Sequence, residues 1–493
     1  PISTCVSRAA PERNSATPGE RSRGVHLGKE LDGMNRLYFS YGAGLISALM
    51  LLSGCAGQST SALPPAQVSS SAASDAAERI YGSRGAIQHI VIIIQENRTV
   101  DNLFNGLPGA DTVNAGKNMN GETIELKPIS LTAPYDMSHR HEAWQNDYNG
   151  GAMNGFNTEP ENCHLSGHCP PDETASYGYI QRTQTWQYWE MAQSFTFADK
   201  LFQSNQGPSF PAHQYLISGT STIGDHSDLK ASDNPGDTEG ISKQGGCDSV
   251  KSTRVKTIDP AGNEGKLVFP CFERKSIMDL MNKNGISWTY YQESGGAGQF
   301  HAVDAIKQIR YGPSYDNVKW PSAKVLQDIH KGRLAQVVFV TPSANASDHP
   351  GSNNGSGPSW VASVVNAIGN SQYWGSTAIV VTWDDWGGWY DHVKPPVYNS
   401  FELGFRVPMI VISPYARRKY VSHTQYEFGS ILKFVEDTFS LGSLGTTDVR
   451  ATSIADCFKF DSKATAFTPI RTNLPPGYFE RLPVSSEPVD DDQ

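Results

Sequence analysis

Long apolar runs and basic tracts are scarce in this chain of 493 residues, and no internal repeat is evident. The apolar run at 45–52 is shorter than the roughly 20 residues that a typical membrane-spanning helix requires. The formal net charge is -10 and Lys and Arg are not clustered, which argues against nucleic-acid binding because that requires concentrated positive charge. The chain is long enough for one large core with insertions, and its 46 glycines suit long loops over a sheet.

The first 85 residues are predicted to lie outside the folded domain. Residues 1–33 do not begin with Met and carry no apolar periodicity, so we interpret them as a mis-called extension, with Met34 as the initiator. Residues 34–55 have a short basic start, a brief apolar run and the ending LSGC, which resembles a bacterial lipoprotein signal whose Cys55 becomes lipidated. An ordinary signal peptide with a chance cysteine is the alternative. Residues 56–85 are predicted to be a flexible tether, so we expect an exported bacterial protein that a lipid anchor holds at the cell envelope or periplasm.

Cysteines are also few, and beyond the predicted signal region they are Cys163, Cys169, Cys247, Cys271 and Cys457. The first two and the next two are predicted to pair, each closing a short loop in an oxidising compartment, which leaves Cys457 free. The spacing of the first pair does not fit the usual zinc pairs, so His164 and His168 between them are not interpreted as zinc ligands.

The apolar stretch 89–94 ends abruptly in the polar letters QENR. Its Ile and Val residues are β-branched, so the stretch predicts a strand that is buried on both faces. Glu96 and Asn97 would lie at the carboxyl end of this strand, where ligands bind in open α/β sheets. A carboxylate beside a carboxamide offers oxygen donors to a hard metal ion. A polar turn that closes a core strand is the alternative.

A second apolar stretch, 376–383, runs directly into Asp384 and Asp385. Adjacent carboxylates repel unless a cation or a proton separates them. The two glycines at 387–388 would let the backbone approach a ligand closely. If both stretches are strands of one parallel sheet, three carboxylates and one amide meet at the same edge. Two unrelated acidic turns are the alternative.

The letters QENRTVDNLF at 95–104 and WDDWGGWYDHV at 383–393 together resemble the bacterial phosphoesterase family, over about residues 86–475. That family contains phospholipases C and acid phosphatases and belongs to the alkaline phosphatase superfamily. The resemblance implies one divalent metal ion, held by Glu96, Asn97, Asp384 and Asp385. Oxygen ligands favour Mg, Ca or Mn, but relatives in the superfamily use several metals, so zinc remains open.

Gly207 and Pro208 interrupt the chain before Ser209, and a helix is expected to start just after it. A hydroxyl there would face the positive end of the helix, where anions bind. The residues alone favour an ordinary N-cap serine. The resemblance makes Ser209 the predicted nucleophile and a further metal ligand. Many relatives carry Asn-Arg where this chain has Ala212 and His213, which puts the substrate contacts in question.

Histidines are the expected proton donors, because imidazole titrates near neutrality. His139 lies in a segment that resembles the family's histidine-containing segment, and His349 follows the apolar stretch 337–341. These two are ranked first for protonating a leaving oxygen or contacting phosphate, followed by His141 and His392. A hydrogen-bonded structural role is the alternative for each of them. His301 and His423 are interpreted as structural.

The remaining pattern alternates between helix and strand, which predicts an α/β fold with a mostly parallel central sheet and helices on both faces. Predicted helices cover 276–284, 360–368 and 430–439, and further strands cover 286–292 and 407–413. Residues 145–190 and 222–270 are predicted to be loop-rich insertions, and 476–493 an acidic disordered tail after the phosphoesterase domain at 86–475.

The predicted chemistry is hydrolysis of phosphoric esters through a phosphoserine intermediate. The substrate is expected to be a phospholipid or a small phosphate ester, with a phospholipase C-like phosphodiesterase first and a phosphomonoesterase of the acid phosphatase type second. A lipoprotein that binds phosphate esters without turnover is the non-enzyme alternative. A sulfatase is less favoured because no Cys- or Ser-x-Pro-x-Arg pattern is evident. The sequence does not indicate the oligomeric state.

Overall fold

The computed structural model describes residues 82–159, 161–163, 173–236 and 244–484. The chain divides into two units, 1–66 and 67–493, and all described residues belong to the second. The predicted extension, the signal sequence and most of the tether lie outside the described residues and stay predictions. Within the described ranges, no helix combines the length and the apolarity needed to cross a membrane.

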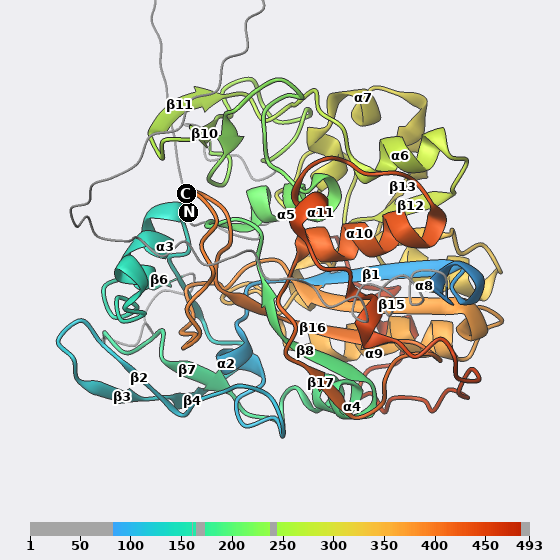
Figure 1. The fold of residues 1–493 in the computed structure, drawn as a ribbon, viewed down its shortest axis with the longest axis horizontal. Helices are drawn as coiled ribbons and strands as arrows, with labels where there is room; N and C mark the ends of the chain where they lie inside the picture. The colour runs from blue at the N-terminus through green and yellow to red at the C-terminus, as the bar shows by residue number, and fades with distance from the viewer. Residues whose placement is uncertain (1–81, 160, 164–172, 237–243, 485–493) are drawn as a thin grey trace, which may run out of the picture. The chain divides into compact units, whose positions relative to one another are not determined.

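A nine-stranded sheet forms the centre of this unit (Figure 1). Its order is β13-β12-β14-β1-β15-β16-β8-β17, with β18 paired to β8, and every pairing is parallel except the two that β16 makes. This confirms the predicted mostly parallel sheet. The strands are β1 (His89–Gln95), β8 (Thr196–Phe202), β12 (Trp288–Tyr291), β13 (Val318–Lys319), β14 (Val337–Val340), β15 (Thr377–Trp383), β16 (Arg406–Ile412), β17 (Tyr420–Ser422) and β18 (Tyr426–Glu427).

The two strands that carry the acidic motifs are neighbours at the middle of the sheet. β1 and β15 run parallel, and Gln95 at the end of β1 lies opposite Trp383 at the end of β15. All of β15, and all of β1 after His89, is buried, as expected for β-branched strands covered on both faces. Glu96 and Asp384 therefore leave the sheet side by side at its carboxyl edge.

Helices cover both faces of the sheet, which confirms the predicted α/β class (Figure 1). On one face lie α5 (Ser209–Ser218), α6 (Ile277–Lys283) and α10 (Phe428–Phe439). On the other face lie α4 (Trp186–Ser194), α8 (Lys324–His330) and α9 (Gly357–Gly369). The helix predicted to begin at 360 starts earlier, at Gly357, because Pro358 is well suited to a first helical turn.

The insertion predicted at 145–190 includes residues that belong to the core of the fold. Residues 145–190 include β7 (Gly178–Ile180) and the start of α4, which packs in the helical layer. The buried face of α4 includes Tyr188 and Trp189. The loop-like composition on either side of the helix conceals its helical periodicity in the sequence. The other predicted insertion, 222–270, forms a small antiparallel sheet of β9 (Lys230–Ala231), β10 (Val255–Ile258) and β11 (Glu264–Val268).

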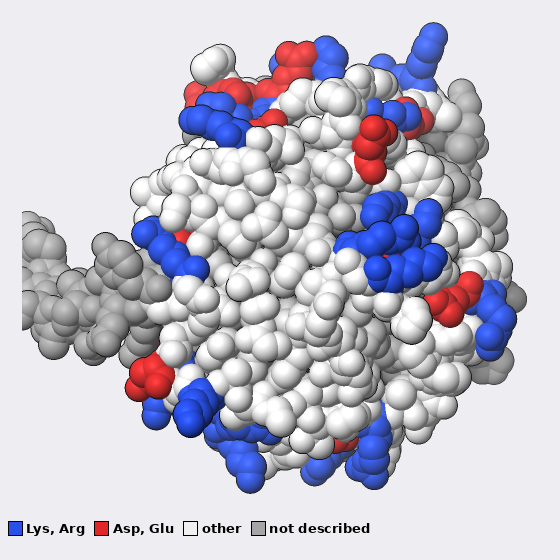
Figure 2. Space-filling model, turned by 90° about the vertical axis from the view of Figure 1, so that its right-hand side faces the viewer, with Lys and Arg blue, Asp and Glu red and all other residues white. Residues whose placement is uncertain are grey.

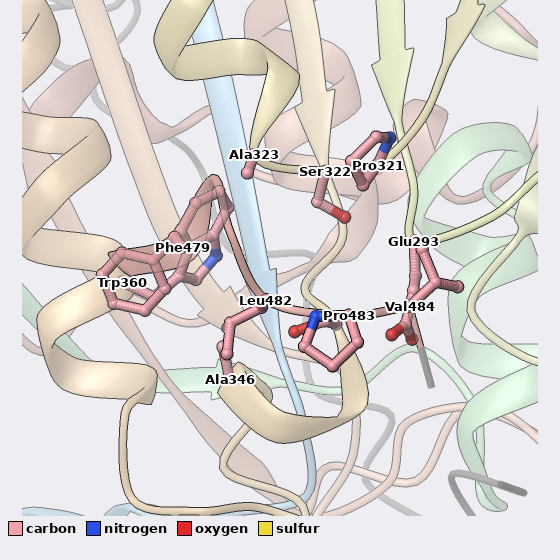
Figure 3. Close-up of a pocket in the computed structure, with 11 residues that line it drawn as sticks. Glu293, Pro321, Ser322, Ala323, Ala346, Trp360, Phe479, Leu482, Pro483 and Val484 are labelled. Carbon is pink, nitrogen blue, oxygen red and sulfur yellow. The ribbon is translucent and has the colours of Figure 1, made fainter. Parts of the chain in front are cut away.

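The folded unit continues past the boundary predicted at residue 475. α12 (Pro476–Phe479) places Phe479 against Trp360 of α9, with the ring centroids 5.3 Å apart. An apolar pocket lies at this contact and includes Leu482 and Val484 in its lining (Figure 3). The correction has a simple cause, since burial of an aromatic and an aliphatic side chain holds the segment to α9.

On the face drawn in Figure 2, Lys and Arg side chains are more prominent than Asp and Glu side chains. Lys and Arg side chains form small groups there, Asp and Glu side chains lie between or beside them, and a broad uncharged area separates the groups.

A disulfide joins Cys247 to Cys271, as predicted, and Cys457 is buried and forms no disulfide among the described residues. The predicted bond between Cys163 and Cys169 lies outside the described residues. Cys247 and Cys271 are 24 residues apart in sequence, and their disulfide closes the loop that contains β10 and β11.

Replacing both cysteines of this bond with serine is expected to lower the free energy of unfolding by about 3 kcal/mol, because the unfolded chain gains the entropy of an open loop. Urea unfolding of the double variant Cys247→Ser/Cys271→Ser against the oxidised protein measures the difference. A Cys457→Ser variant is the control for loss of a thiol alone. Equal midpoints for the double variant and the parent would contradict the expectation.

Candidate active site

The predicted nucleophile and the four predicted metal ligands converge at the carboxyl edge of the sheet. Glu96 and Asn97 follow β1, Asp384 and Asp385 follow β15, and Ser209 is the first residue of α5. Ser209 Oγ lies 3.4 Å from Glu96 Oε2, 3.4 Å from Asn97 Oδ1 and 3.2 Å from Asp385 Oδ2. Each of the five residues has no exposed surface. Ser209 is inside the helix rather than its cap, since Pro208 occupies the N-cap position.

Backbone strain supports this arrangement. Asn97 adopts a left-handed conformation with φ of 60°, which non-glycine residues rarely take and which is typical of functional sites. Its N–H donates to Asp384 Oδ1 at 3.1 Å and so ties the two strand ends together. Gly387 is required beside it, because a Cβ there would lie 2.6 Å from the Asn97 carbonyl oxygen. Gly387 thus permits a close approach of the two strand ends, whereas the predicted approach of this backbone to a ligand stays a prediction.

His213 is a member of this site that the sequence reasoning missed. It lies one turn after Ser209 on α5, with Nε2 3.0 Å from Glu96 Oε1 and 3.7 Å from Asp384 Oδ2. Burial lowers the pKa of His213 to about 4, and the ring stacks on Phe300 with centroids 5.3 Å apart. The signal in the sequence is its spacing of four residues from Ser209, which places both side chains on one helix face.

Without a bound cation, the negative charges of the buried carboxylates in this site repel one another. Burial, and then the neighbouring Glu96, raise the pKa of Asp384 well above its usual range. Three carboxylates, a carboxamide oxygen and a hydroxyl are the donors that a hard divalent cation prefers. The buried acidic and histidine groups can therefore hold a metal ion.

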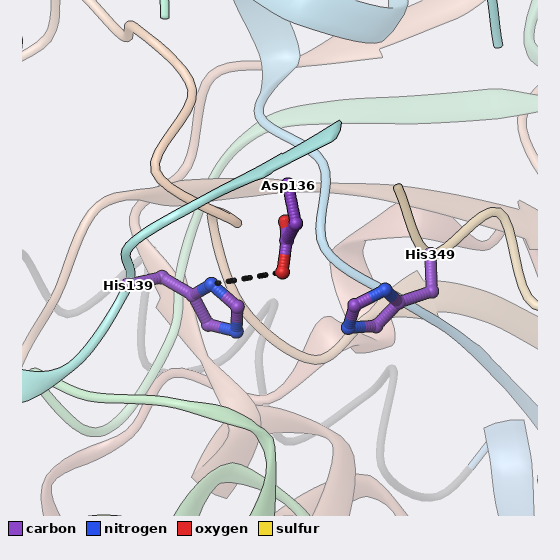
Figure 4. Close-up of side chains that lie close together, drawn as sticks. All are labelled: Asp136, His139 and His349. Carbon is purple, nitrogen blue, oxygen red and sulfur yellow. Dashed lines mark ion pairs between the residues drawn. The ribbon is translucent and has the colours of Figure 1, made fainter. Parts of the chain in front are cut away.

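His139 joins the same site through Asn97. The side-chain amide of Asn97 donates to His139 Nε2 at 3.0 Å, so His139 Nδ1 carries the proton and donates to the Met137 carbonyl oxygen at 2.8 Å. Asp136, on β5 (Tyr135–Met137), approaches the same Nδ1 at 3.8 Å. His349 lies across from this pair, 6.1 Å from His139 between ring centroids (Figure 4). The structure thus brings together the two histidines that were ranked first.

A buried network behind His349 fixes its position. Asp348 has a left-handed φ of 71°, and Arg98 donates to its carbonyl oxygen at 2.8 and 3.1 Å. The Asp348 carboxylate accepts from Tyr188 Oη at 2.6 Å and from Trp383 Nε1 at 3.3 Å. Burial raises the pKa of Asp348 to about 6 despite these donors. His349 donates through Nδ1 to the Pro350 carbonyl oxygen at 2.7 Å, which directs Nε2 away from the backbone.

His141 contacts other residues than His139 and His349 do. It is the first residue of α3 (His141–Tyr148), and its Nδ1 donates to the Gln206 carbonyl oxygen at 2.5 Å. Its Nε2 accepts from Gln145 Nε2 at 3.0 Å, and its ring packs on Phe401. Both ring nitrogens are engaged, so the structure uses His141 to hold the segment that leads to Ser209.

His392 lies in a separate charged cluster and not beside Ser209. His392 Nδ1 is 2.6 Å from Asp101 Oδ2, and Nε2 is 3.1 Å from Asp111 Oδ1. Arg406 binds Asp391 through two bonds of 2.9 and 3.0 Å and completes the cluster. The glycines at 387–388 both have positive φ, and the chain after them leads to Asp101 and Asp111 rather than to the predicted metal ligands. Sequence proximity to Asp385 therefore misplaced this histidine.

Replacing His392 with Asn is expected to destabilise the protein by about 1.5–3 kcal/mol at about pH 5.5, and by less at about pH 8.5. Burial is the largest single effect and opposes the charge of His392, but the Asp101 and Asp391 carboxylates together outweigh it and raise the pKa. The stabilisation by protonated His392 is therefore complete below the pKa of about 6.5 that this histidine has in the unfolded chain. It is lost as pH rises through the higher pKa that the histidine has in the folded protein. Urea unfolding at both pH values measures it. The exposed-histidine variant His330→Asn is the control, and a destabilisation by His392→Asn that grows with pH would contradict the assignment.

Several known proteins are similar to this chain. Phospholipase C A of Mycobacterium tuberculosis is 26% identical, with 79% of each chain covered. The hemolytic phospholipase C of Pseudomonas aeruginosa is 24% identical over 79% of this chain and 58% of that protein. Among solved structures, a protein of the alkaline phosphatase superfamily from Vibrio parahaemolyticus matches with 11% identity, a TM-score of 0.35, and coverage of 74% of this chain and 70% of that chain.

The Phosphoesterase family matches residues 87–442, which include the nucleophile candidate, the four predicted metal ligands and the histidines described above. The chain belongs to this family, and it is a hydrolase of phosphoric esters.

Proposed function

We propose that the chain is a metal-dependent phosphodiesterase of the phospholipase C type that acts through a phosphoserine intermediate at Ser209. The observation that carries the proposal is the position of Ser209 Oγ, which lies within 3.4 Å of one oxygen each from Glu96, Asn97 and Asp385. A nucleophilic hydroxyl and a cation site share this point, and that is what activation of a serine alkoxide requires.

A divalent ion held by Glu96, Asn97, Asp384 and Asp385 would lower the pKa of the serine hydroxyl and offset charge on phosphate oxygens. Ser209 attacks phosphorus from the N-terminus of α5, whose free N–H groups and dipole favour the anionic phosphoryl group. The new bond joins Ser209 Oγ to phosphorus while the bond from phosphorus to the alcohol oxygen breaks.

One of the two grouped histidines supplies the protons. His349, protonated at Nε2, gives that proton to the departing alkoxide, and the same nitrogen accepts a proton from the water that then cleaves the phosphoserine. Its Nδ1 donates to the Pro350 carbonyl oxygen, which leaves Nε2 for this role. His139 has both ring nitrogens engaged and positions Asn97. The products are the alcohol and the phosphate ester of the head group.

A phospholipid is the proposed substrate, because both curated relatives named above are phospholipases C. An exported, lipid-anchored protein would meet such a substrate at a membrane, which accords with the signal sequence expected at 34–55. Convergence of Ser209, His139 and His349 disfavours a binding protein without turnover, since mere binding needs no buried nucleophile.

The test uses p-nitrophenylphosphorylcholine as a phosphodiester and p-nitrophenyl phosphate as a monoester, each with added Mg, Ca, Mn or Zn and with chelator. We expect faster turnover of the diester, loss with chelator and recovery with one of the metals. Faster turnover of the monoester would replace the proposal with an acid phosphatase. Turnover of neither substrate under any metal, with a folded protein, would leave the binding-protein alternative.

A further inference from the structure

The small sheet of β9, β10 and β11 packs against the N-terminal end of α5, where Ser209 lies. Phe210, the residue after Ser209, is fully buried in an apolar cluster that includes Ala231 of β9. Gly207 precedes the helix and lies close to the same insertion, since a Cβ there would be 2.8 Å from the Ser232 carbonyl oxygen. The insertion is therefore held directly against the segment that presents the proposed nucleophile.

Asn234 of this insertion reaches the end of the helix. Its Oδ1 accepts a hydrogen bond of 3.0 Å from the N–H of Phe210, one of the α5 amide groups that has no partner within the helix. A backbone N–H can only donate, so this contact fixes which side-chain atom is the oxygen and directs the other atom, Nδ2, away from Phe210 N. The Asn234 N–H donates to Asp233 Oδ1 at 3.1 Å, and Lys256 Nζ donates to Asp233 Oδ2 at 3.1 Å. Asn234 is 5% exposed and is held in one orientation by its backbone and by its side chain.

The side chains of α5 offer no cation to a phosphoryl group. The helix contains neither Lys nor Arg, and its histidine, His213, faces Glu96. A phosphoryl group on Ser209 nevertheless needs donors for the oxygens on which negative charge develops. Asn234 is bonded to the residue directly after Ser209, so its carboxamide lies beside the place where that group would form. We propose that Asn234 Nδ2 donates a hydrogen bond to a non-bridging oxygen of this phosphoryl group, an inference that rests on the proposed function.

The neutral carboxamide also bears on which phosphate ester is preferred. A phosphodiester carries one negative charge, whereas a phosphomonoester carries about 1.5 to 2 at pH 7. A cationic side chain would attract the monoester more strongly, because the attraction scales with the charge of the ligand, but a neutral donor gives no such advantage. Asn234 at this position therefore accords with the phosphodiester proposed as the substrate.

The competing interpretation is that Asn234 only caps α5 by accepting the hydrogen bond from the Phe210 N–H. Asn234→Asp separates the two interpretations, because a carboxylate keeps the acceptor but has no donor. Asp caps helices as well as Asn does, and negative charge is favourable at a helix N-terminus, so a capping role alone would survive the change. A donor to phosphate would be lost, and a negative charge would lie beside the phosphoryl group in its place.

The first measurement is kinetic and uses the full chain with the metal ion that gives the highest turnover. Asn234→Asp is expected to lower kcat for p-nitrophenylphosphorylcholine by about 10²–10³-fold, the loss typical for one donor to a developing oxyanion. The loss should be larger for p-nitrophenyl phosphate, because the repulsion grows with the charge of the phosphate. The control Asn263→Asp, at an exposed asparagine between β10 and β11, should match the wild type. Equal activity of Asn234→Asp and the wild type would leave only the capping role and overturn the proposal.

The second measurement uses the wild type alone, so it does not depend on the folding of a variant. A crystal structure of the Mn-loaded protein with vanadate, a mimic of a phosphoryl group in transfer, is expected to show Asn234 Nδ2 within about 3.2 Å of a vanadate oxygen. A vanadate with Nδ2 turned away from it would overturn the proposal, as would a site that takes up no vanadate. The contact without turnover of either p-nitrophenyl substrate would support this proposal and contradict the proposed function. Turnover of the diester that Asn234→Asp leaves unchanged would support the proposed function and contradict this proposal.

Discussion

Ser209→Ala is expected to lower the turnover number by about 10⁴-fold or more, with much smaller effects on substrate affinity and stability. The hydroxyl is the only group of the site that forms a bond to phosphorus in the proposed reaction, so its loss removes the two-step route altogether. Ser209 is fully buried, and its Oγ lies 3.2–3.4 Å from oxygens of three predicted metal ligands. Replacing it with alanine removes one oxygen atom and creates no large cavity.

Steady-state kinetics on p-nitrophenylphosphorylcholine measures the loss, and acid quench followed by peptide mass spectrometry detects a phosphoryl group on Ser209 of the wild type. The matched control is Ser218→Ala, a second buried serine at the other end of α5. If Ser209→Ala keeps more than about a tenth of the wild-type turnover, the serine is not the nucleophile.

The part of the site that could be predicted from residues alone is the part that strands position. Glu96 and Asp384 follow stretches so apolar that only fully buried strands accommodate them, and such strands occupy the middle of a sheet. The two ends were expected to meet if the strands were parallel, and they are adjacent.

The helical part of the site could not be predicted in this way. All residues of α5 are buried, so no polar face shows which way Ser209 points, and the assignment of the serine depended on the resemblance to the family. His213 was missed for the same reason, because a spacing of four residues is informative only when the direction of the first residue is known.

The direction of individual strands also could not be predicted from the sequence. β16 is antiparallel to both of its neighbours, yet its apolar pattern is that of a parallel strand. β8, which was not predicted, contains Asp199 and Lys200 within an otherwise apolar stretch. The carboxylate of Asp199 is buried because it accepts from the Asp111 N–H and lies 2.9 Å from His423 Nδ1, partners that only the folded chain supplies.

Asp384→Asn is expected to separate stability from function. In the metal-free protein, burial and the nearby Glu96 disfavour the charge of Asp384, so its removal should raise the free energy of unfolding by about 0.5–2 kcal/mol. Asn retains an oxygen that can accept from the Asn97 N–H, so the link between the strand ends survives. Turnover should be lost, because the substitution removes the negative charge of a predicted metal ligand.

The measurement is denaturant unfolding with chelator and with metal. In the wild type, metal at about 100 times its dissociation constant should add about 2.7 kcal/mol, and Asp384→Asn should gain little or nothing. The exposed-carboxylate variant Asp316→Asn controls for a general change in charge, and its response to metal should equal that of the wild type. If Asp384→Asn were less stable than the wild type in chelator, the carboxylate would act mainly as a structural acceptor. The crowding of buried charge at the strand ends would then not be the force that draws a cation into the site.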